Sequence, residues 1–150
     1  MESPKKDNDF VKKIISQPEG INLDFKQSIS NQQKIAKSIV AFANTFGGTI
    51  VVGVSDQGQI TGIDPEEEKF MLGEAIANYC TPPITHRFET YEIAFWKDEK
   101  LEEEKYILLL HIPESQAKPH YVVDSEGTRT YYLRKEDRSV PVSKDAEGEF

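Results

Sequence analysis

The stretch of sequence that decides the fold is IVAFANTFGGTIVVGVSDQGQITGI, residues 39–63. Its first part continues an apolar stripe with intervals of three and four residues, which is typical of a helix packed on a sheet. The Gly47-Gly48 pair ends that helix, because the residue just past a helix often needs a positive φ, which glycine adopts freely. The β-branched run 49–54, the turn residues 55–58 and the run 59–63 together predict a β-hairpin.

The helix and a preceding strand can be traced upstream of this stretch. Ser30 and Gln33 have the spacing of a capping box, so the helix is expected to begin there. Residues 21–26 alternate apolar and polar side chains, which predicts a half-buried strand. The same alternation places Asp24 and Lys26 together on the exposed face of that strand.

Downstream, the pattern adds a second helix and two strand pairs. Asp64 is an N-cap with Pro65 at the first helical position, which predicts a helix to about Tyr79. Residues 84–96 and 105–112 form one predicted antiparallel pair around an acidic loop, and 120–123 and 128–134 form another. Short connections predominate. The predicted fold class is therefore α+β, a mostly antiparallel sheet with two main covering helices.

Composition limits the classes of function. The 150 residues suit one domain, and no apolar run approaches the roughly 20 residues of a membrane helix. No signal peptide is visible at the N-terminus, so a cytoplasmic location without membrane association is expected. The net charge of −8 argues against indiscriminate binding to nucleic acid, although the acidity is concentrated in residues 41–110.

Several residue types and motifs give no evidence of a metal site, a disulfide or a catalytic site. Cys80 is the only cysteine, which excludes an internal disulfide, and it is expected to be a small buried hydrophobe. His86, His111 and His120 lack the spacing of metal ligands and are expected in structural or surface roles. The sequence has no phosphate-binding glycine loop and no serine-centred elbow, so nucleotide hydrolysis and acyl transfer have no support.

An ordered series of motifs resembles the Schlafen-type AlbA-like domain. It consists of Leu-Asp-Phe-Lys at 23–26, Ala-Phe-Ala-Asn-Thr at 41–45, Gly-Gly, Gly-Val-Ser-Asp at 53–56 and Tyr-Tyr-Leu-Arg at 131–134. The resemblance covers residues 19–143. It leaves 1–18 as an N-terminal extension, with polar, mobile residues 1–9 and a short helix near 10–15, and 144–150 as a C-terminal tail.

The resemblance implies a nucleic-acid-binding module for RNA or DNA, regulatory or part of a larger system. Asn44 and Thr45 would then present an amide and a hydroxyl to a phosphate, or else cap the helix end. Tyr131 or Tyr132 would stack on an unpaired base, while alternation makes the other tyrosine part of the core. The candidate phosphate contacts are basic residues of the two terminal segments: Lys26, Lys34, Lys37, Arg129, Arg134, Lys135 and Arg138.

The resemblance also implies an alternative function, a metal-dependent endoribonuclease acting on structured RNA. Carried over by position, Glu19, Asp24 and Asp56 would hold Mg²⁺ or Mn²⁺, and Lys26 would stabilise charge on the phosphate. Without that activity, the same carboxylates would be a surface residue, a strand residue paired with Lys26, and a turn former. The animal enzymes use two such lobes, so a homodimer is a further expectation.

This sequence departs from the family pattern at three places. Asp24 stands where Glu is usual, Ser55 replaces an acidic residue, and Lys135 follows Arg134 where a glycine is common. A third class of function, a protein-interaction module that uses the acidic middle of the chain, also stays open.

Overall fold

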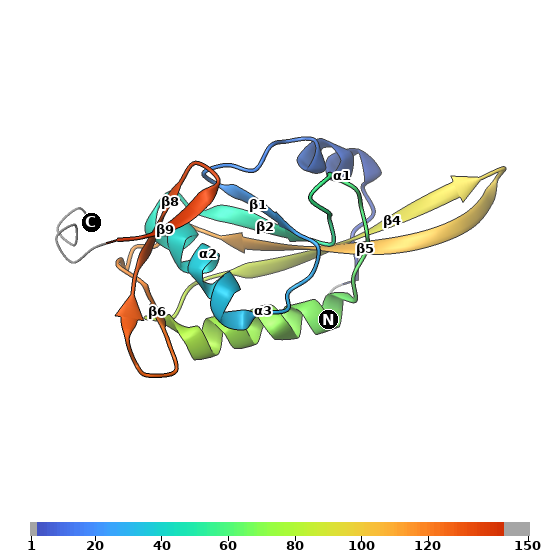
Figure 1. Ribbon diagram of the computed structural model, residues 1–150. Helices are drawn as coiled ribbons and strands as arrows, with labels where there is room; N and C mark the ends of the chain where they lie inside the picture. Colours follow the sequence, from blue (N-terminus) through green and yellow to red (C-terminus); the bar gives the residue numbers. More distant parts are fainter. Residues whose placement is uncertain (1–2, 143–150) are drawn as a thin grey trace.

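The protein is described by a computed structural model in which residues 3–142 are placed (Figure 1). Its central sheet has the strand order β1-β2-β5-β4. Strand β1 (Leu23–Lys26) runs parallel to β2 (Gly48–Val52), while β2 and β4 (Arg87–Lys97) each pair antiparallel with β5 (Lys100–Ile112). The prediction of an α+β fold with a mostly antiparallel sheet is confirmed.

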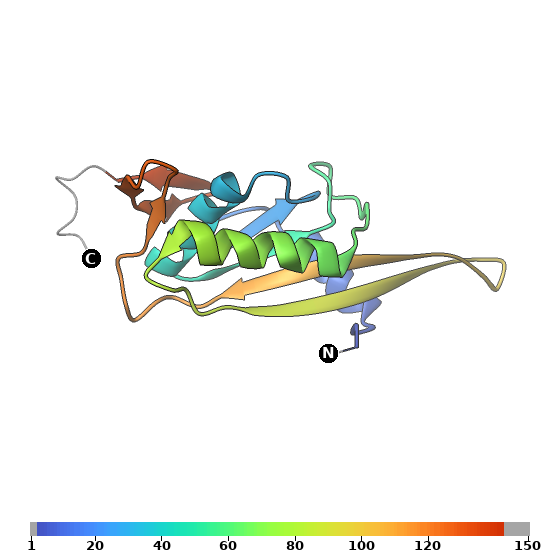
Figure 2. The same ribbon diagram turned by 90° about the horizontal axis from the view of Figure 1, so that it is seen from below.

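Helices α2 (Gln32–Asn44) and α3 (Pro65–Tyr79) cover one face of this sheet (Figures 1 and 2). The apolar stripe of α2 is buried against the sheet as its periodicity predicts, except at Phe46, which lies past the end of the helix and is 67% exposed. Asp64 caps α3 as expected. The N-cap of α2 is Asn31 rather than Ser30, because the Asn31 side chain accepts a hydrogen bond from the Lys34 amide at 2.9 Å.

Helix α1 (Asn8–Ile15) covers the opposite face of the sheet. Val11 is buried, and the ring of Phe10 stacks on Tyr91 with 4.9 Å between centroids. The Lys5 amide donates to the Thr90 carbonyl at 2.8 Å, and the Lys5 carbonyl accepts from Glu92. Residues around Lys5, in the segment that we expected to be mobile, thus bridge to the edge of β4.

The Gly47-Gly48 pair lies in the short, closely packed connection between α2 and β2. Gly47 has φ of 74°, and a Cβ there would lie 2.7 Å from backbone atoms of Ile112 and Glu114. A Cβ on Gly48 would lie 2.5 Å from the ring of Phe42. Neither position accepts a side chain without a shift of the backbone or the core, so α2 and the sheet pack closely here.

The predicted hairpin of residues 49–54 and 59–63 is reduced to a single bridge between Val54 and Ile60. Strand β2 instead takes β1 and β5 as its two neighbours. Ile50, Val51 and Val52 are completely buried, so the strand needs cover on both faces and on both edges. A central position provides that cover.

Strands β4 and β5 form a long hairpin that extends beyond the rest of the molecule (Figures 1 and 2). The acidic segment predicted as a loop lies mostly within β5, and the turn itself consists of Asp98 and Glu99, both with positive φ. The acidic residues are exposed, as expected for a solvated surface.

The C-terminal part forms two small sheets. Strands β3 (Cys80–Thr81), β6 (Tyr121–Val123) and β7 (Arg129–Thr130) make one, and the hairpin of β8 (Tyr132–Lys135) and β9 (Arg138–Pro141) makes the other. The predicted strand 128–134 is therefore interrupted at Tyr131, whose side chain is buried. The predicted tail 144–150 lies outside the described residues.

Two expectations from composition can be compared with this fold. Cys80 is buried as expected, and burial raises the pKa of its thiol to about 12. Among the described residues, no helix has the length and apolar character needed to cross a membrane.

Candidate nucleic-acid interface

A pocket of about 420 Å³ lies where β1, α2 and the β8–β9 hairpin meet. We call it the basic groove. Ten residues from segments far apart in the sequence line it: Glu19, Asp24, Lys26, Lys34, Lys37, Ser38, Arg134, Asp137, Arg138 and Ser139.

Helix α2 contributes three of these residues through its periodicity. Lys34, Lys37 and Ser38 are three and four positions apart, so they lie on one face of the helix. The Lys37 ammonium stands 5.8 Å from the ring centre of Tyr132, which is half-buried. Tyr131 is buried, which confirms that one tyrosine of the pair belongs to the core.

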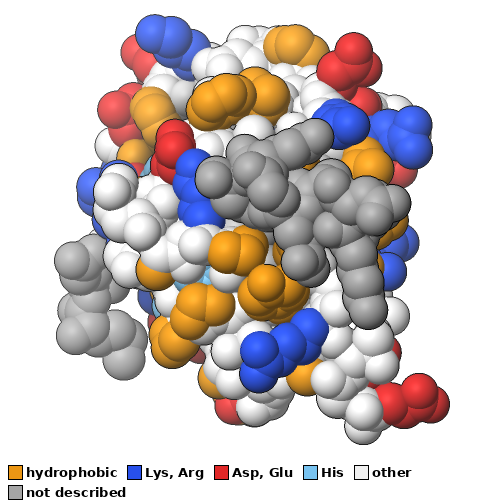
Figure 3. Space-filling model, turned by 90° about the vertical axis from the view of Figure 1, so that its left-hand side faces the viewer, with side chains coloured by type: hydrophobic (Ala, Val, Ile, Leu, Met, Phe, Trp, Pro, Cys, Tyr) orange, Lys and Arg blue, Asp and Glu red, His pale blue; other side chains and the backbone are white. Residues whose placement is uncertain are grey.

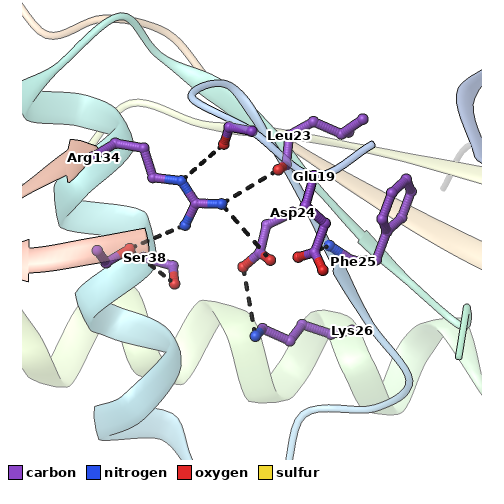
Figure 4. Close-up of polar contacts among 9 residues, drawn as sticks. Glu19, Leu23, Asp24, Phe25, Lys26, Ser38 and Arg134 are labelled. Carbon is purple, nitrogen blue, oxygen red and sulfur yellow. Dashed lines mark hydrogen bonds and ion pairs between the residues drawn. The ribbon is translucent and has the colours of Figure 1, made fainter. Parts of the chain in front are cut away.

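A buried ion pair organises the floor of the groove (Figure 4). Asp24 is only 3% exposed, so the expectation of an exposed Asp24 is wrong. The cause is the hairpin, which brings the Arg134 guanidinium to 3.8 Å from the Asp24 carboxylate. Lys26 completes the arrangement, with its ammonium 3.6 Å from the same carboxylate.

Arg134 is itself buried and has structural partners. Its Nε donates to the Gly20 carbonyl at 3.0 Å, one terminal nitrogen donates to the Ser139 hydroxyl at 3.1 Å, and the other donates to the Leu23 carbonyl at 3.3 Å. The guanidinium also lies 4.6 Å from the ring centre of Phe42. These contacts tie the hairpin to the start of β1 and occupy the side chain that we expected to contact phosphate.

Glu19 stands beside Asp24 at the edge of the groove (Figure 4). Its carboxylate accepts a hydrogen bond from the Phe25 amide at 3.2 Å. A hydrogen bond with the Asp24 carboxyl, together with partial burial, raises the pKa of Glu19 above its ordinary value. The two carboxyl groups therefore resist carrying two negative charges at once.

The charge of the groove differs in sign from that of the whole chain. Five cations and three acids line it, a formal charge of 5 − 3 = +2 in a chain of net charge −8. A smaller pocket of about 150 Å³ shares Lys26, Lys34 and Ser38 with it and continues to the first turn of α2. The two pockets together form a local basic surface along α2.

Asn44 and Thr45 do not face this groove, contrary to the expected phosphate contact. The Asn44 amide nitrogen donates to the carbonyls of His120 and Tyr132 at 2.9 and 3.0 Å, and its oxygen accepts from the His120 amide at 2.8 Å. Thr45 donates its hydroxyl hydrogen to the Ala41 carbonyl and accepts from the Arg134 amide. Both side chains join the end of α2 to the C-terminal strands.

The remaining predicted site residues lie elsewhere. Arg129 and Lys135 are exposed, but neither lines the basic groove. Asp56 is also exposed, in a turn that follows β2, and it does not line the groove with Glu19 and Asp24. Within residues 3–142, no group of three His, Cys, Asp or Glu side chains is arranged to hold a metal ion. The described residues therefore do not fit the three-carboxylate Mg²⁺ or Mn²⁺ site.

Sequence reasoning missed Ser38, Asp137 and Ser139. Helical spacing from Lys34 could have indicated Ser38, but Asp137 and Ser139 required knowledge of the β8–β9 hairpin. That hairpin turns at Glu136, which has φ of 55°, a conformation natural for glycine. The departure from the family pattern is at the neighbouring Lys135, which does not have a positive φ.

Comparison with known proteins bears on the fold and the family of the chain. No curated protein matches the chain. The protein DIP2311 from Corynebacterium diphtheriae has a similar fold, with a TM-score of 0.52 and 19% identity, over 93% of this chain and 27% of that one. The family described as "Schlafen, AlbA_2" matches residues 19–143. The chain therefore belongs to the Schlafen AlbA_2 family.

Proposed function

We propose that this protein is a nucleic-acid-binding module that holds a phosphate backbone in the basic groove. The observation that carries the proposal is the gathering of Lys26, Lys34, Lys37 and Arg138 in one groove of a chain with net charge −8. An acidic protein repels nucleic acid at long range, so binding requires a local cluster of cations. Membership of the Schlafen AlbA_2 family supports the same function.

The groove favours contacts to phosphate over reading of base edges. Lysine ammonium groups act as point charges, and contacts of this kind position a strand without specifying its sequence. Tyr132 offers part of its ring beside Lys37, which suits stacking of an unpaired base. We therefore expect single strands or RNA with unpaired bases to bind better than duplex DNA.

Replacing Lys34, Lys37 and Arg138 together with alanine tests the groove. We expect affinity for a labelled single strand to fall by about 10- to 100-fold near 50 mM salt, because each cation lost removes a phosphate contact. Fluorescence anisotropy with RNA, single-stranded DNA and duplex DNA, repeated at several salt concentrations, measures this loss. The salt dependence should become shallower in the variant.

A matched control removes the same charges elsewhere. The variant with Lys12, Lys13 and Lys97 replaced by alanine also loses three cations, all of them exposed and outside the groove. We expect it to bind nearly as well as the wild type. An equal loss in both variants, or no binding by the wild type to any of the three probes, would contradict the proposal.

The variant Glu19→Gln should bind nucleic acid more tightly than the wild type. It removes a negative charge from the groove, and we expect a gain of about two- to fivefold at low salt. Asp56→Asn removes the same charge from an exposed turn outside the groove and should leave the affinity unchanged. Anisotropy titration of both variants decides this, and unchanged or weaker binding by Glu19→Gln would count against the groove.

The same two variants address the alternative, a metal-dependent endoribonuclease. The neighbouring carboxyl groups of Glu19 and Asp24 favour it, and the position of Asp56 outside the groove opposes it. A nuclease would cleave transfer RNA in the presence of Mn²⁺ and lose that activity in Glu19→Gln. A binding module would leave the RNA intact in every variant.

We also propose that the protein works within a larger assembly. The chain spans only 27% of the length of DIP2311, so in that protein the fold is part of a longer chain. Two copies of this chain would place two basic grooves in one particle, and light scattering with and without RNA tests for such a homodimer.

A further inference from the structure

A second pocket, of about 440 Å³, opens at the end of the central sheet where β2 and β4 begin and β5 ends. We call it the His111 pocket, and it shares no lining residue with the basic groove. Figure 3 faces this end of the molecule and shows hydrophobic and basic side chains close together, with small areas of histidine among them. Phe46, Thr49, His86, Arg87 and His111 are among the residues that line it.

Phe46 forms an unusual wall of this pocket. It follows the end of α2 and is 67% exposed, the largest exposure among the large hydrophobic side chains of the described residues. The tight turn at Gly47 holds the backbone beside it. An exposed aromatic ring at the rim of a polar pocket is a suitable surface for stacking a planar ligand.

The floor of the pocket contains a chain of hydrogen bonds across three strands. The Thr49 hydroxyl lies 3.0 Å from His111 Nδ1, and His111 Nε2 contacts the Glu89 carboxylate. Burial alone would raise the pKa of Glu89, but hydrogen bonds from Lys5, His111 and Arg87 lower it to about 2. Glu89 is therefore ionised and holds the proton of a neutral His111 on Nε2, so that Nδ1 accepts from Thr49.

Basic and polar groups stand at the mouth of the pocket. Arg87 is 66% exposed in its side chain, and its Nη1 lies 3.1 Å from Glu89, which leaves other donors of the guanidinium fork for a ligand. His86 contacts the Ile84 carbonyl through Nδ1, so its Nε2 can contact a ligand. Thr49 and Arg87 flank His111 on the two neighbouring strands, so one anion can reach both.

We propose that the His111 pocket binds a nucleoside phosphate, with the base stacked on Phe46 and the phosphate held by Arg87 and Thr49. The volume lies in the range of small-ligand sites, and apolar walls with a few converging polar groups are typical of them. The ligand is either a free mononucleotide or one unpaired nucleotide of a strand. The inference does not rest on the basic groove, because the two pockets are lined by different residues.

His111 makes this binding sensitive to pH. The charged and titratable groups around it are Arg87 and Glu89 on β4 and Lys5 on the N-terminal segment, with the Thr49 hydroxyl on β2. A protonated His111 adds a positive charge and donates from Nδ1 to Thr49, which frees the Thr49 hydroxyl hydrogen for the phosphate. Burial lowers the pKa of His111 below 6.5, so binding should strengthen as the pH falls below that value.

Titration with AMP, followed by amide chemical shifts, tests the proposal. We expect AMP to bind. Ribose 5-phosphate, which lacks the base, and adenosine, which lacks the phosphate, should each bind at least about tenfold more weakly. Phe46→Ala and Arg87→Ala should each weaken AMP binding by about tenfold. The matched control is Phe70→Ala, which removes a 63% exposed phenylalanine from α3 and should change nothing.

Further titrations distinguish the two sources of the ligand and show which of the two pockets binds it. If an oligonucleotide binds more tightly than AMP, and Phe46→Ala weakens it, the ligand is a nucleotide of a strand; equal affinity indicates a free nucleotide. Both outcomes support the pocket. The same titrations in the variant lacking Lys34, Lys37 and Arg138 should still show binding at the His111 pocket, so its failure and failure of the groove are distinguishable.

The pH arm uses a dinucleoside monophosphate, whose phosphodiester keeps one charge throughout. Its affinity should rise by about threefold or more between pH 7.5 and 5, and Thr49→Val should reduce that rise. If Arg87→Ala does not fold, Arg87→Gln replaces it, with the spectrum of the free protein as the check. Absence of AMP and oligonucleotide binding, or binding unchanged by Phe46→Ala and Arg87 substitution, overturns the proposal.

Discussion

Replacing Arg134 with methionine is expected to lower the free energy of unfolding by about 3–5 kcal/mol, because the buried Asp24 carboxylate keeps only the partly exposed Lys26 ammonium, 3.6 Å away, as a cationic partner. Asp24 is 3% exposed and would lose the guanidinium that neutralises it. The carbonyls of Gly20 and Leu23 would lose a donor as well. Urea unfolding followed by circular dichroism measures the change.

Two further variants show whether the ion pair is the cause. Arg138→Met changes an exposed arginine of the same hairpin and should cost no more than about 0.5 kcal/mol. Adding Asp24→Asn to Arg134→Met should restore part of the lost stability, because the buried charge that lost its guanidinium partner is then gone. A loss below about 1 kcal/mol in Arg134→Met would mean that the buried pair contributes little.

Replacing Asn44 with alanine is expected to cost about 3 kcal/mol, because several buried backbone groups would be left without a partner. The Asn44 side chain satisfies the amide and carbonyl of His120 and the carbonyl of Tyr132. These contacts connect the end of α2 with the residue before β6 and with the start of β8, more than seventy residues away. Thermal unfolding and urea titration together measure the effect.

Asn78→Ala is the matched control for this substitution. Asn78 lies exposed on α3, where its amide donates to Glu74 at 2.8 Å within the same helix. We expect its replacement to change stability by less than about 0.5 kcal/mol. Equal losses in the two variants would show that Asn44 does not join the helix to the C-terminal strands.

Both predictions affect how binding experiments on this protein should be designed. Arg134, Asn44 and Thr45 belong to the motifs that resemble the Schlafen-type domain, yet their side chains are engaged within the fold. A variant at any of them can lose binding because the groove is no longer held in shape. Lys34, Lys37 and Arg138 line the groove from outside the core and are the better probes of binding.

The sequence by itself determined the local elements of this protein. The apolar stripe before Gly47, the cap at Asp64 and the β-branched run of β2 each occur where their periodicity or capping chemistry indicated. The motif series also identified the family, which the match over residues 19–143 confirms. These features depend on neighbouring residues, so they can be read along the chain.

Only the tertiary structure decided which strands are neighbours of β2 and which site residues meet. Burial on both faces placed β2 between β1 and β5, and the β8–β9 hairpin buried Asp24 beneath Arg134. The same packing brought Arg138 to Lys34 and Lys37 and placed Asp56 outside the groove. Alternation along a strand shows which side chains share a face, but whether that face meets water depends on segments about a hundred residues away.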